Sequence, residues 1–248
     1  MMPIGPLMVE HRLIERMIAL VDREAKRIRA TGKVDTDFVL SAIDFIRLYA
    51  DRCHHGKEED ILFRALKEKP LPANLRAVLE ELEAEHAQGR RTVARMALVR
   101  ERVLMGDKAA VRDLAALMED VARFYPLHIA KEDQAFFLPC MEFLSAEEQA
   151  RLLEEGFAFD QRLLHTHFEA LADVREGKPP APAAQAVPLE GADARAYGCM
   201  VCGYTYDPRL GDPTQRIPPG TPFNQLPESW ICPHCHANLK VFLTLQRP

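Results

Sequence analysis

Apolar residues recur every three or four positions over most of the first 175 residues of the chain. This spacing gives an α-helix one continuous apolar face. The pattern is interrupted at Gly32, Pro70, Pro72, Gly106 and from Pro139 to Ser145. The predicted helices span residues 7–30, 35–68, 73–105, 108–138 and 145–176. Because the loops between them are short, we expect an all-α, up-down-up-down four-helix bundle with an additional fifth helix.

The pattern changes abruptly after residue 176. Residues 177–196 are rich in proline and alanine and have no helical period, which indicates a semi-extended linker. Residues 197–248 are rich in glycine, proline and aromatic residues, and we expect a small β- and turn-rich module there. A module of this size needs a bound metal in addition to its apolar core. The sequence therefore predicts two domains, a helical bundle over 1–176 and a metal-stabilised module over 197–248.

A pattern of histidine and glutamate occurs twice within the helical region. The segment VEHRLIERM aligns with AEHAQGRRT, and CHHGKEEDILF aligns with LHIAKEDQAFF. Each half thus supplies one histidine from its first helix and a His-x-x-x-Glu pair from its second. Residues four apart lie one helical turn apart, so such a pair can reach the same metal ion. The six residues are His11, His54, Glu58, His86, His128 and Glu132.

A helical wheel at about 100° per residue places these six side chains on the apolar faces of their helices. On this wheel His55 and Glu59 lie roughly 100–140° from His54, so the pair expected to point inward is His54 with Glu58. A single histidine on an apolar face is usually a hydrogen-bonded core residue. Six such groups cannot be buried without joint compensation, however, and their repetition favours a metal site. Two half-sites predict two metals with bridging glutamates, and imidazole with carboxylate suits iron, manganese or zinc.

On this duplicated motif, residues 7–140 resemble the hemerythrin-like HHE cation-binding domain. The resemblance implies a carboxylate-bridged di-iron centre with the six residues above as ligands. The oxygen carriers of that family have a further histidine one turn from the one on the third helix. Leu82 and Arg90 stand at those positions here. This difference argues against reversible oxygen carriage and leaves one coordination position for another group.

Several groups are candidates for that position. His165 and Asp160 lie on the fifth helix, where the apolar stripe leaves His165 toward a flank, so His165 is either a ligand or a solvated side chain. Glu15 on the first helix and a water molecule are the other candidates. Tyr125 lies near the stripe of His128 and is either a core residue or a hydrogen-bond donor to a bound oxygen species.

The C-terminal module contains two Cys-x-x-Cys pairs. Each pair directs two thiolates toward one ion, and two pairs build a tetrahedral four-sulfur site. The four cysteines are Cys199, Cys202, Cys232 and Cys235. By spacing alone a zinc ribbon is the alternative, but the 29 residues between the inner cysteines exceed the common zinc spacing.

Over residues 197–242 the segments CMVCGYTYDP, GDP, PGTPF and SWICPHC resemble rubredoxin. This resemblance implies one iron atom on the four cysteines that carries one electron. Rubredoxins usually have glycine after the last cysteine, where this chain has His236. Glycine eases the turn at that point, so the substitution is expected to alter the iron's surroundings without removing a ligand.

Charge and hydropathy limit the partners. The formal net charge is -5, and nucleic acid is not an expected partner because phosphate binding needs clustered lysine and arginine. No apolar run reaches the roughly 18 residues of a membrane span, and the N-terminal segment lacks a signal-peptide core. We therefore expect a cytoplasmic protein whose cysteines are thiols or metal ligands.

Together these features predict a non-haem iron oxidoreductase that acts in oxidative stress. A tethered rubredoxin can supply the di-iron site with electrons to reduce hydrogen peroxide or dioxygen, with nitric oxide as a further candidate. The rubrerythrins, which join a four-helix di-iron domain to a rubredoxin-like one, are analogous in architecture, although their sequence motifs differ. Such an enzyme needs an upstream donor such as a rubredoxin reductase, and electrons could pass within one chain or across a homodimer. The alternatives are an oxygen-binding or oxygen-, iron- or redox-sensing protein without turnover, and a structural protein with zinc in both domains.

Overall fold

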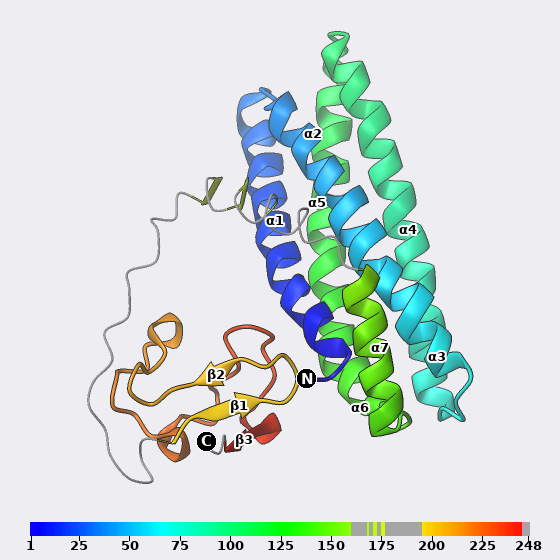
Figure 1. Cartoon of the computed structure of the whole chain (residues 1–248). Helices are drawn as coiled ribbons and strands as arrows, with labels where there is room; N and C mark the ends of the chain where they lie inside the picture. Colours follow the sequence, from blue (N-terminus) through cyan, green and yellow to red (C-terminus); the bar gives the residue numbers. More distant parts are fainter. Residues whose placement is uncertain (160–167, 169–170, 173–174, 177–194, 245–248) are drawn as a thin grey trace. The chain divides into compact units, whose positions relative to one another are not determined.

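The computed structural model describes residues 1–159, 168, 171–172, 175–176 and 195–244 (Figure 1). The chain forms two compact units, Leu13–Lys178 and Pro179–Pro248 together with Met1–Arg12. The first helix runs through this division without a break. None of the described helices combines the length and the hydropathy needed to cross a bilayer.

The predicted helical bundle is confirmed, and its four long segments lie side by side (Figure 1). The first is α1 (Ile4–Thr31) and the third is α4 (Ala73–Leu104). The second is composite and consists of α2 (Thr36–Asp44), η1 (Phe45–His55), η2 (Glu58–Phe63) and α3 (Arg64–Lys67). The fourth consists of α5 (Lys108–Lys131), η3 (Glu132–Phe136) and α6 (Phe137–Met141), and α7 (Ala146–Phe159) follows it.

Polar side chains determine where several helices begin. Asp35 accepts a hydrogen bond from a backbone N–H in the first turn of α2, and Asp107 accepts two in the first turn of α5. At α7 the Ser145 N–H donates to Glu148 Oε2 at 2.9 Å, and the Glu148 N–H donates to Ser145 Oγ at 3.2 Å. This reciprocal pair is a capping box, which stabilises the start of α7.

Three segments within the described helices, η1, η2 and η3, are π-helical. A π-helix bonds each N–H one residue further back than an α-helix does, so successive side chains rotate by less than 100°. These wider turns contain the predicted site residues His54, Glu58 and Glu132, and they also contain His55. The helical wheel that applies to α1 and α4 therefore does not apply at these segments.

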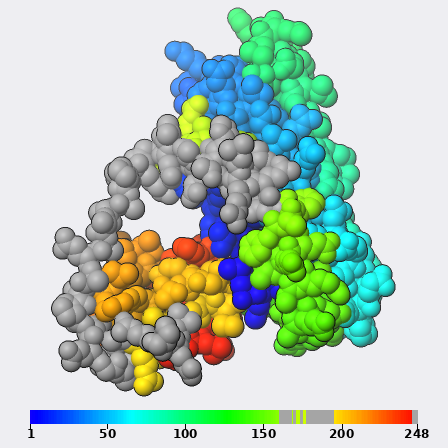
Figure 2. Space-filling model, in the orientation of Figure 1, coloured from blue at the N-terminus to red at the C-terminus, as the bar shows by residue number. Residues whose placement is uncertain are grey.

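The apolar stripes of the helices are buried as the sequence predicts. Among the fully or almost fully buried side chains are Ile14, Ile18 and Val21 of α1, Val39 and Ile43 of α2, Leu79, Leu82 and Val93 of α4, and Leu117 and Val121 of α5. α7 packs against η2. In Figure 2 the green residues of α7 lie against the cyan residues of the second helical segment. The site residues are therefore enclosed by apolar packing on several helices.

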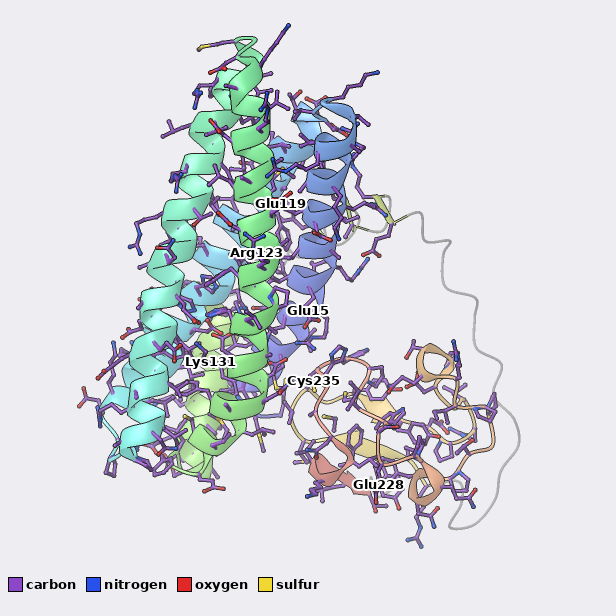
Figure 3. The ribbon with its side chains drawn as sticks, turned by 180° about the vertical axis from the view of Figure 1, so that it is seen from behind. Glu15, Glu119, Arg123, Lys131, Glu228 and Cys235 are labelled. Atoms are coloured by element: carbon purple, nitrogen blue, oxygen red, sulfur yellow. The ribbon has the colours of Figure 1, made fainter. Side chains whose placement is uncertain are left out.

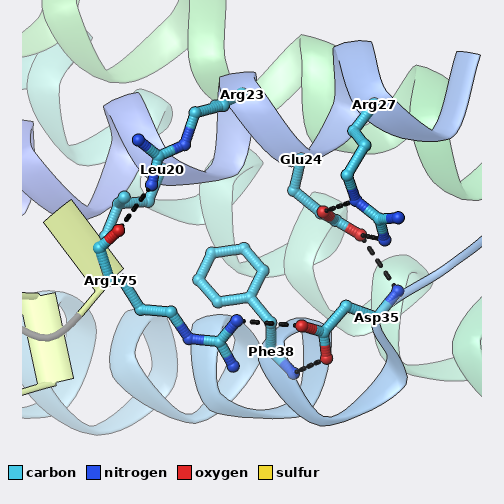
Figure 4. Close-up of a pocket in the computed structure, with 7 residues that line it drawn as sticks. All are labelled: Leu20, Arg23, Glu24, Arg27, Asp35, Phe38 and Arg175. Atoms are coloured by element: carbon cyan, nitrogen blue, oxygen red, sulfur yellow. Dashed lines mark hydrogen bonds and ion pairs between the residues drawn. The ribbon is translucent and has the colours of Figure 1, made fainter. Parts of the chain in front are cut away.

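The described residues Arg175 and Glu176 pack on the first two helices of the bundle. The Arg175 guanidinium forms an ion pair with Asp35 at 2.8 Å and lies 4.9 Å from the ring centroid of Phe38 (Figure 4). Glu176 forms an ion pair with Arg16 at 3.2 Å. The contacts of Arg175 border a hollow of about 400 Å³, and none of the predicted metal ligands in the described segments lines it.

The C-terminal unit is built on a small antiparallel sheet with the strand order β2-β1-β3. Its strands are β1 (Tyr197–Cys199), β2 (Thr205–Tyr206) and β3 (Phe242–Thr244). Trp230 is buried against the rings of Tyr206 and Phe242, and its indole N–H donates to the buried Asp212 at 2.8 Å. A core of a few aromatic rings is small, which agrees with the prediction that a metal site supplements it.

Candidate metal centres

Seven buried side chains with metal-binding atoms converge in the described part of the helical bundle, each at most 2% exposed. They form two groups, and within each group the ligand atoms lie within 4.8 Å of one another. The first group, which we call the carboxylate cluster, consists of His11, His54, Glu58 and Glu132. The second, which we call the three-histidine cluster, consists of His55, His86 and His128. The six residues that the duplicated motif predicts are all present, and His55 is added to them.

The expectation that His55 points outward is wrong. Its ring is 2% exposed and stacks on the ring of His86 with the centroids 3.9 Å apart. Within η1 successive side chains rotate by less than 100°, so a wheel drawn at that angle misplaces His55. His55 is thus placed where it could serve as the additional histidine that neither Leu82 nor Arg90 can supply.

Of the other side-chain candidates for the additional ligand position, the structure describes Glu15. Glu15 is half-buried on α1 (Figure 3) and belongs to neither cluster. His165 and Asp160 lie outside the described residues.

Glu58 faces both clusters. Its Oε1 lies 3.2 Å from Nε2 of His54, and its Oε2 lies 3.4 Å from Nε2 of His86. Both oxygens are buried, and neither accepts a hydrogen bond from any described residue. A buried carboxylate in this situation is costly unless a cation compensates it, so the arrangement fits bound metal.

Glu132 occupies the corresponding place in the second half of the bundle. Its Oε1 lies 3.3 Å from Nε2 of His128 and 3.7 Å from Nε2 of His86. Glu132 also belongs to the carboxylate cluster, so it reaches both groups, as Glu58 does. Two carboxylates shared by two sets of histidines can bridge a pair of ions.

Each ring of the three-histidine cluster has a carboxylate on its Nδ1 side. Glu59 lies 2.7 Å from Nδ1 of His86, and Glu85 lies 2.8 Å from Nδ1 of His128. The contact of His55 is longer, 3.4 Å to Asp51. An ionised carboxylate only accepts, so the Nδ1–H of His86 and of His128 donates to it, and in the neutral ring Nε2 keeps its lone pair. The two Nε2 atoms of His86 and His128 lie 3.2 Å apart, as two ligands of one ion would require.

Surface cations hold these outer carboxylates in place. Arg90 forms ion pairs with Asp51 at 2.7 Å and with Glu59 at 2.8 Å. Lys131 of α5 (Figure 3) forms an ion pair with Glu85 at 2.6 Å. Sequence reasoning left open whether Glu59 contributes and assigned no role to the others, because isolated charges on partly exposed helix faces resemble ordinary solvated residues.

The electrostatics of the three-histidine cluster favour cation binding. Burial, followed by the neighbouring imidazoles of His86 and His54, lowers the pKa of His55 well below its ordinary value. Burial also acts to lower the pKa of His86, but the carboxylates of Glu132, Glu59 and Glu58 outweigh it and raise that pKa to about 9. His55 is thus neutral, which is the form that binds metal, while the surroundings of His86 attract positive charge.

The four cysteines of the C-terminal unit form a second kind of centre. Sγ of Cys199 lies 3.8 Å from Sγ of Cys235, and Sγ of Cys202 lies 3.6 Å from Sγ of Cys232. All four side chains are buried, and the four sulfurs lie within 4.8 Å of one another. Four sulfurs in this arrangement can hold one ion tetrahedrally.

The two cysteine loops have the same backbone geometry but differ in one residue. Gly203 follows the first pair with φ +80°, and its N–H donates to the carbonyl of Cys199 at 2.8 Å. His236 follows the second pair with φ +61°, and its N–H donates to the carbonyl of Cys232 at 2.8 Å. A non-glycine residue in this left-handed region is strained, so His236 occupies a position that favours glycine.

We expect His236→Gly to raise the free energy of unfolding of the C-terminal unit by about 0.5–1 kcal/mol. Relief of the left-handed backbone is worth ~1–2 kcal/mol, and the greater entropy that glycine loses on folding offsets part of it. Denaturant titration followed by the absorption of the iron-loaded cysteine site measures the change. Ala237→Gly, at the next position and without a positive φ, should lower stability instead. A loss of stability in His236→Gly would contradict the prediction.

Comparison with known proteins finds two family models that match this chain. The family model described as the hemerythrin HHE cation binding domain matches residues 2–138, more than half of the chain. The rubredoxin family model matches residues 196–242.

Three curated relatives each match a quarter of the chain or less. A probable rubredoxin of Methanothermobacter thermautotrophicus is 50% identical over 60 residues, which cover 24% of this chain and 95% of that protein. Probable Rubredoxin-1 of Methanocaldococcus jannaschii is 58% identical over 45 residues, which cover 18% of this chain and 56% of that protein. The anaerobic nitric oxide reductase flavorubredoxin of Aeromonas hydrophila is 45% identical over 62 residues, 25% of this chain but 12% of that protein.

Proposed function

This chain belongs to the hemerythrin HHE cation-binding family and carries a C-terminal rubredoxin domain, and from that premise we propose that it reduces hydrogen peroxide or dioxygen at two irons in its bundle. The two domains support non-haem iron redox chemistry or electron transfer, and the four cysteines of the rubredoxin domain support one iron site. In the proposal, the rubredoxin iron passes electrons to the bundle. Because free thiolates persist in a reducing compartment, we place the protein in the cytoplasm.

The observation that carries the proposal is the sharing of two glutamates by two sets of histidines. One ion would take His11 and His54, and the other would take the three-histidine cluster, with Glu58 and Glu132 between them. Neither set fills the six positions of an octahedral ion, so an external ligand can bind.

Two adjacent irons suit a two-electron reaction. Hydrogen peroxide takes up two electrons and two protons, its O–O bond breaks, and two water molecules form. Bound iron would supply the two electrons, one from each ion. The cysteine iron carries one electron at a time, so it must be reduced twice per peroxide by an external donor such as a rubredoxin reductase. Transfer within one chain and transfer between the subunits of a homodimer both satisfy this scheme.

Nitric oxide is a second candidate substrate because one relative is named an anaerobic nitric oxide reductase flavorubredoxin. Two nitric oxide molecules would take up two electrons and two protons to form nitrous oxide and water. The matched residues are 12% of that protein, so this similarity concerns its electron carrier. Nitric oxide therefore belongs in the same assay as peroxide and dioxygen, as a competing substrate.

We expect the iron-loaded protein, reduced without air and supplied with a reductase as donor, to consume hydrogen peroxide over many turnovers. Each peroxide should oxidise two electron equivalents of donor, and the ferric absorption of the cysteine site should appear only when the donor is exhausted. The zinc-loaded protein is the control and should not react, because zinc has no redox chemistry. Slow oxidation that stops after one turnover would favour the sensing or oxygen-binding alternative.

A further inference from the structure

A second hollow in the helical bundle lies directly beside the three-histidine cluster. Its volume is about 230 Å³, and it lies between the second and third helical segments. Asp51 and His55 of η1 line one side, Gly89 and Arg90 of α4 line the other, and Tyr125 of α5 also lines it. A volume of this size accommodates a small polar molecule together with several waters.

The hollow leads from the surface to the candidate metal ligands. Arg47 and Arg90, two of its lining residues, are exposed, whereas His55 and Tyr125 are both 2% exposed. The ring of His55 lies 6.4 Å from that of Tyr125 and 3.9 Å from that of His86, centroid to centroid. A molecule that enters beside Arg90 thus meets His55, the member of the three-histidine cluster that lines the hollow.

Tyr125 is the lining residue of this hollow that carries a hydroxyl group on a buried ring, 2% exposed. A tyrosine hydroxyl can both donate and accept a hydrogen bond. Since Tyr125 lines the hollow, a small molecule there can form a hydrogen bond with it.

Gly89 lines the hollow without a side chain that would occupy its volume. Glycine inside a helix costs about 1 kcal/mol relative to alanine, so its presence in α4 needs a reason. Packing does not require it, since an added Cβ would meet only the ring of Phe124, at an ordinary contact distance of 3.6 Å. A larger side chain at this position would instead reduce the volume of the hollow.

The charges at the mouth do not require an ion. Arg90 is paired with both Asp51 and Glu59, and Arg47 also lines the hollow, so an uncharged molecule or a small anion such as azide can enter. An uncharged molecule that both donates and accepts hydrogen bonds fits such a passage. Hydrogen peroxide has these properties.

We infer that this hollow is the access route and binding site for hydrogen peroxide, with the Tyr125 hydroxyl donating a hydrogen bond to it and Gly89 keeping the passage open. The inference rests on the proposed function, since it names the route by which the substrate of that reaction reaches the bundle. Its test must therefore have a readout that does not depend on turnover.

Azide binding to the oxidised, iron-loaded protein provides that readout. Gly89→Leu should slow azide association by about tenfold or more, measured by stopped-flow absorption, while iron content and the resting spectrum stay as in the wild type. Gly156→Leu is the matched control: it also lies inside a helix, and its added Cβ meets no atom within 4 Å. This control should bind azide at the wild-type rate.

Tyr125→Phe keeps the ring and removes only the hydroxyl, so it serves even if Gly89→Leu does not fold. One hydrogen bond corresponds to about a fivefold change, and we expect the rate of the first oxidation by peroxide to fall by about that factor. Tyr49→Phe, which removes another buried tyrosine hydroxyl that does not line the hollow, should leave the rate unchanged.

The outcomes separate this inference from the proposed function. If Gly89→Leu slows azide association but the wild type does not turn over peroxide, the route stands and the proposed function fails. If the wild type turns over peroxide while Gly89→Leu and Tyr125→Phe match it in both measurements, the route is wrong. Absence of azide binding in the wild type, with peroxide oxidation unaffected by either variant, would overturn it as well.

Discussion

Replacing His55 by alanine is expected to lower the iron content of the bundle from two ions to one. The substitution removes one of the three imidazoles of the three-histidine cluster, while His11 and His54 of the carboxylate cluster remain. Loss even of an outer partner of a metal ligand costs about 10–100-fold in affinity, so loss of the ligand itself should cost at least as much. Iron analysis of the full chain should thus give two ions in place of three, with the cysteine iron as internal standard.

Two matched variants on the same π-helical segment make this result specific. Arg52→Ala changes an exposed neighbour in η1 and should keep the full iron content. His54→Ala should also lose one iron, but from the carboxylate cluster, so the two histidine variants should differ in the spectrum of the remaining iron. Retention of all three irons by His55→Ala would mean that His55 is a core residue and that the six residues of the duplicated motif suffice.

The helices and most of the site could be predicted because they depend on local, periodic signals. The capping box at Ser145 and Glu148 is a short-range pattern, and it forms as expected. His11 and His86 lie on α-helices with ordinary geometry, where a wheel at about 100° per residue assigns the buried face correctly. The cysteine spacing, too, needs no knowledge of distant residues.

The burial of His55 could not be predicted in this way because the helical wheel assumes an α-helical period of about 100° per residue. The apolar spacing of the second segment does not indicate that residues 45–55 form π-turns. A π-bulge displaces every later side chain around the helix, so a wheel drawn through it misplaces them. The signal that was available is the doublet His54-His55, since two adjacent polar rings on one buried segment both need compensation.

The outer carboxylates escaped prediction for another reason. Glu59 and Glu85 lie on half-buried positions, and each acts through a contact with a residue on another helix. Glu59 contacts His86 across 27 positions of the sequence and Glu85 contacts His128 across 43, so only the packed bundle brings them together. Long-range pairing of this kind leaves no local pattern.

Replacing Cys235 by serine is expected to abolish repeated peroxide reduction while leaving the first oxidation of the prereduced bundle intact. The variant removes one of four thiolates from the cysteine site, whose sulfurs lie within 4.8 Å of one another. Without that iron, the external donor must reduce ions enclosed by side chains that are at most 2% exposed. Donor consumption should therefore fall to background, whereas a single-turnover experiment should still show the bundle reacting at the wild-type rate.

The control is a cysteine outside the cysteine site. Cys140 of α6 is buried, and burial raises the pKa of its thiol to about 12, so it stays neutral and unreactive. Cys140→Ala should therefore keep both the first oxidation and repeated turnover. Loss of the first oxidation in Cys235→Ser would indicate damage to the bundle. Undiminished turnover in Cys235→Ser would show that electrons reach the bundle without the rubredoxin iron, and the two domains would then have to be explained as separate functions of one chain.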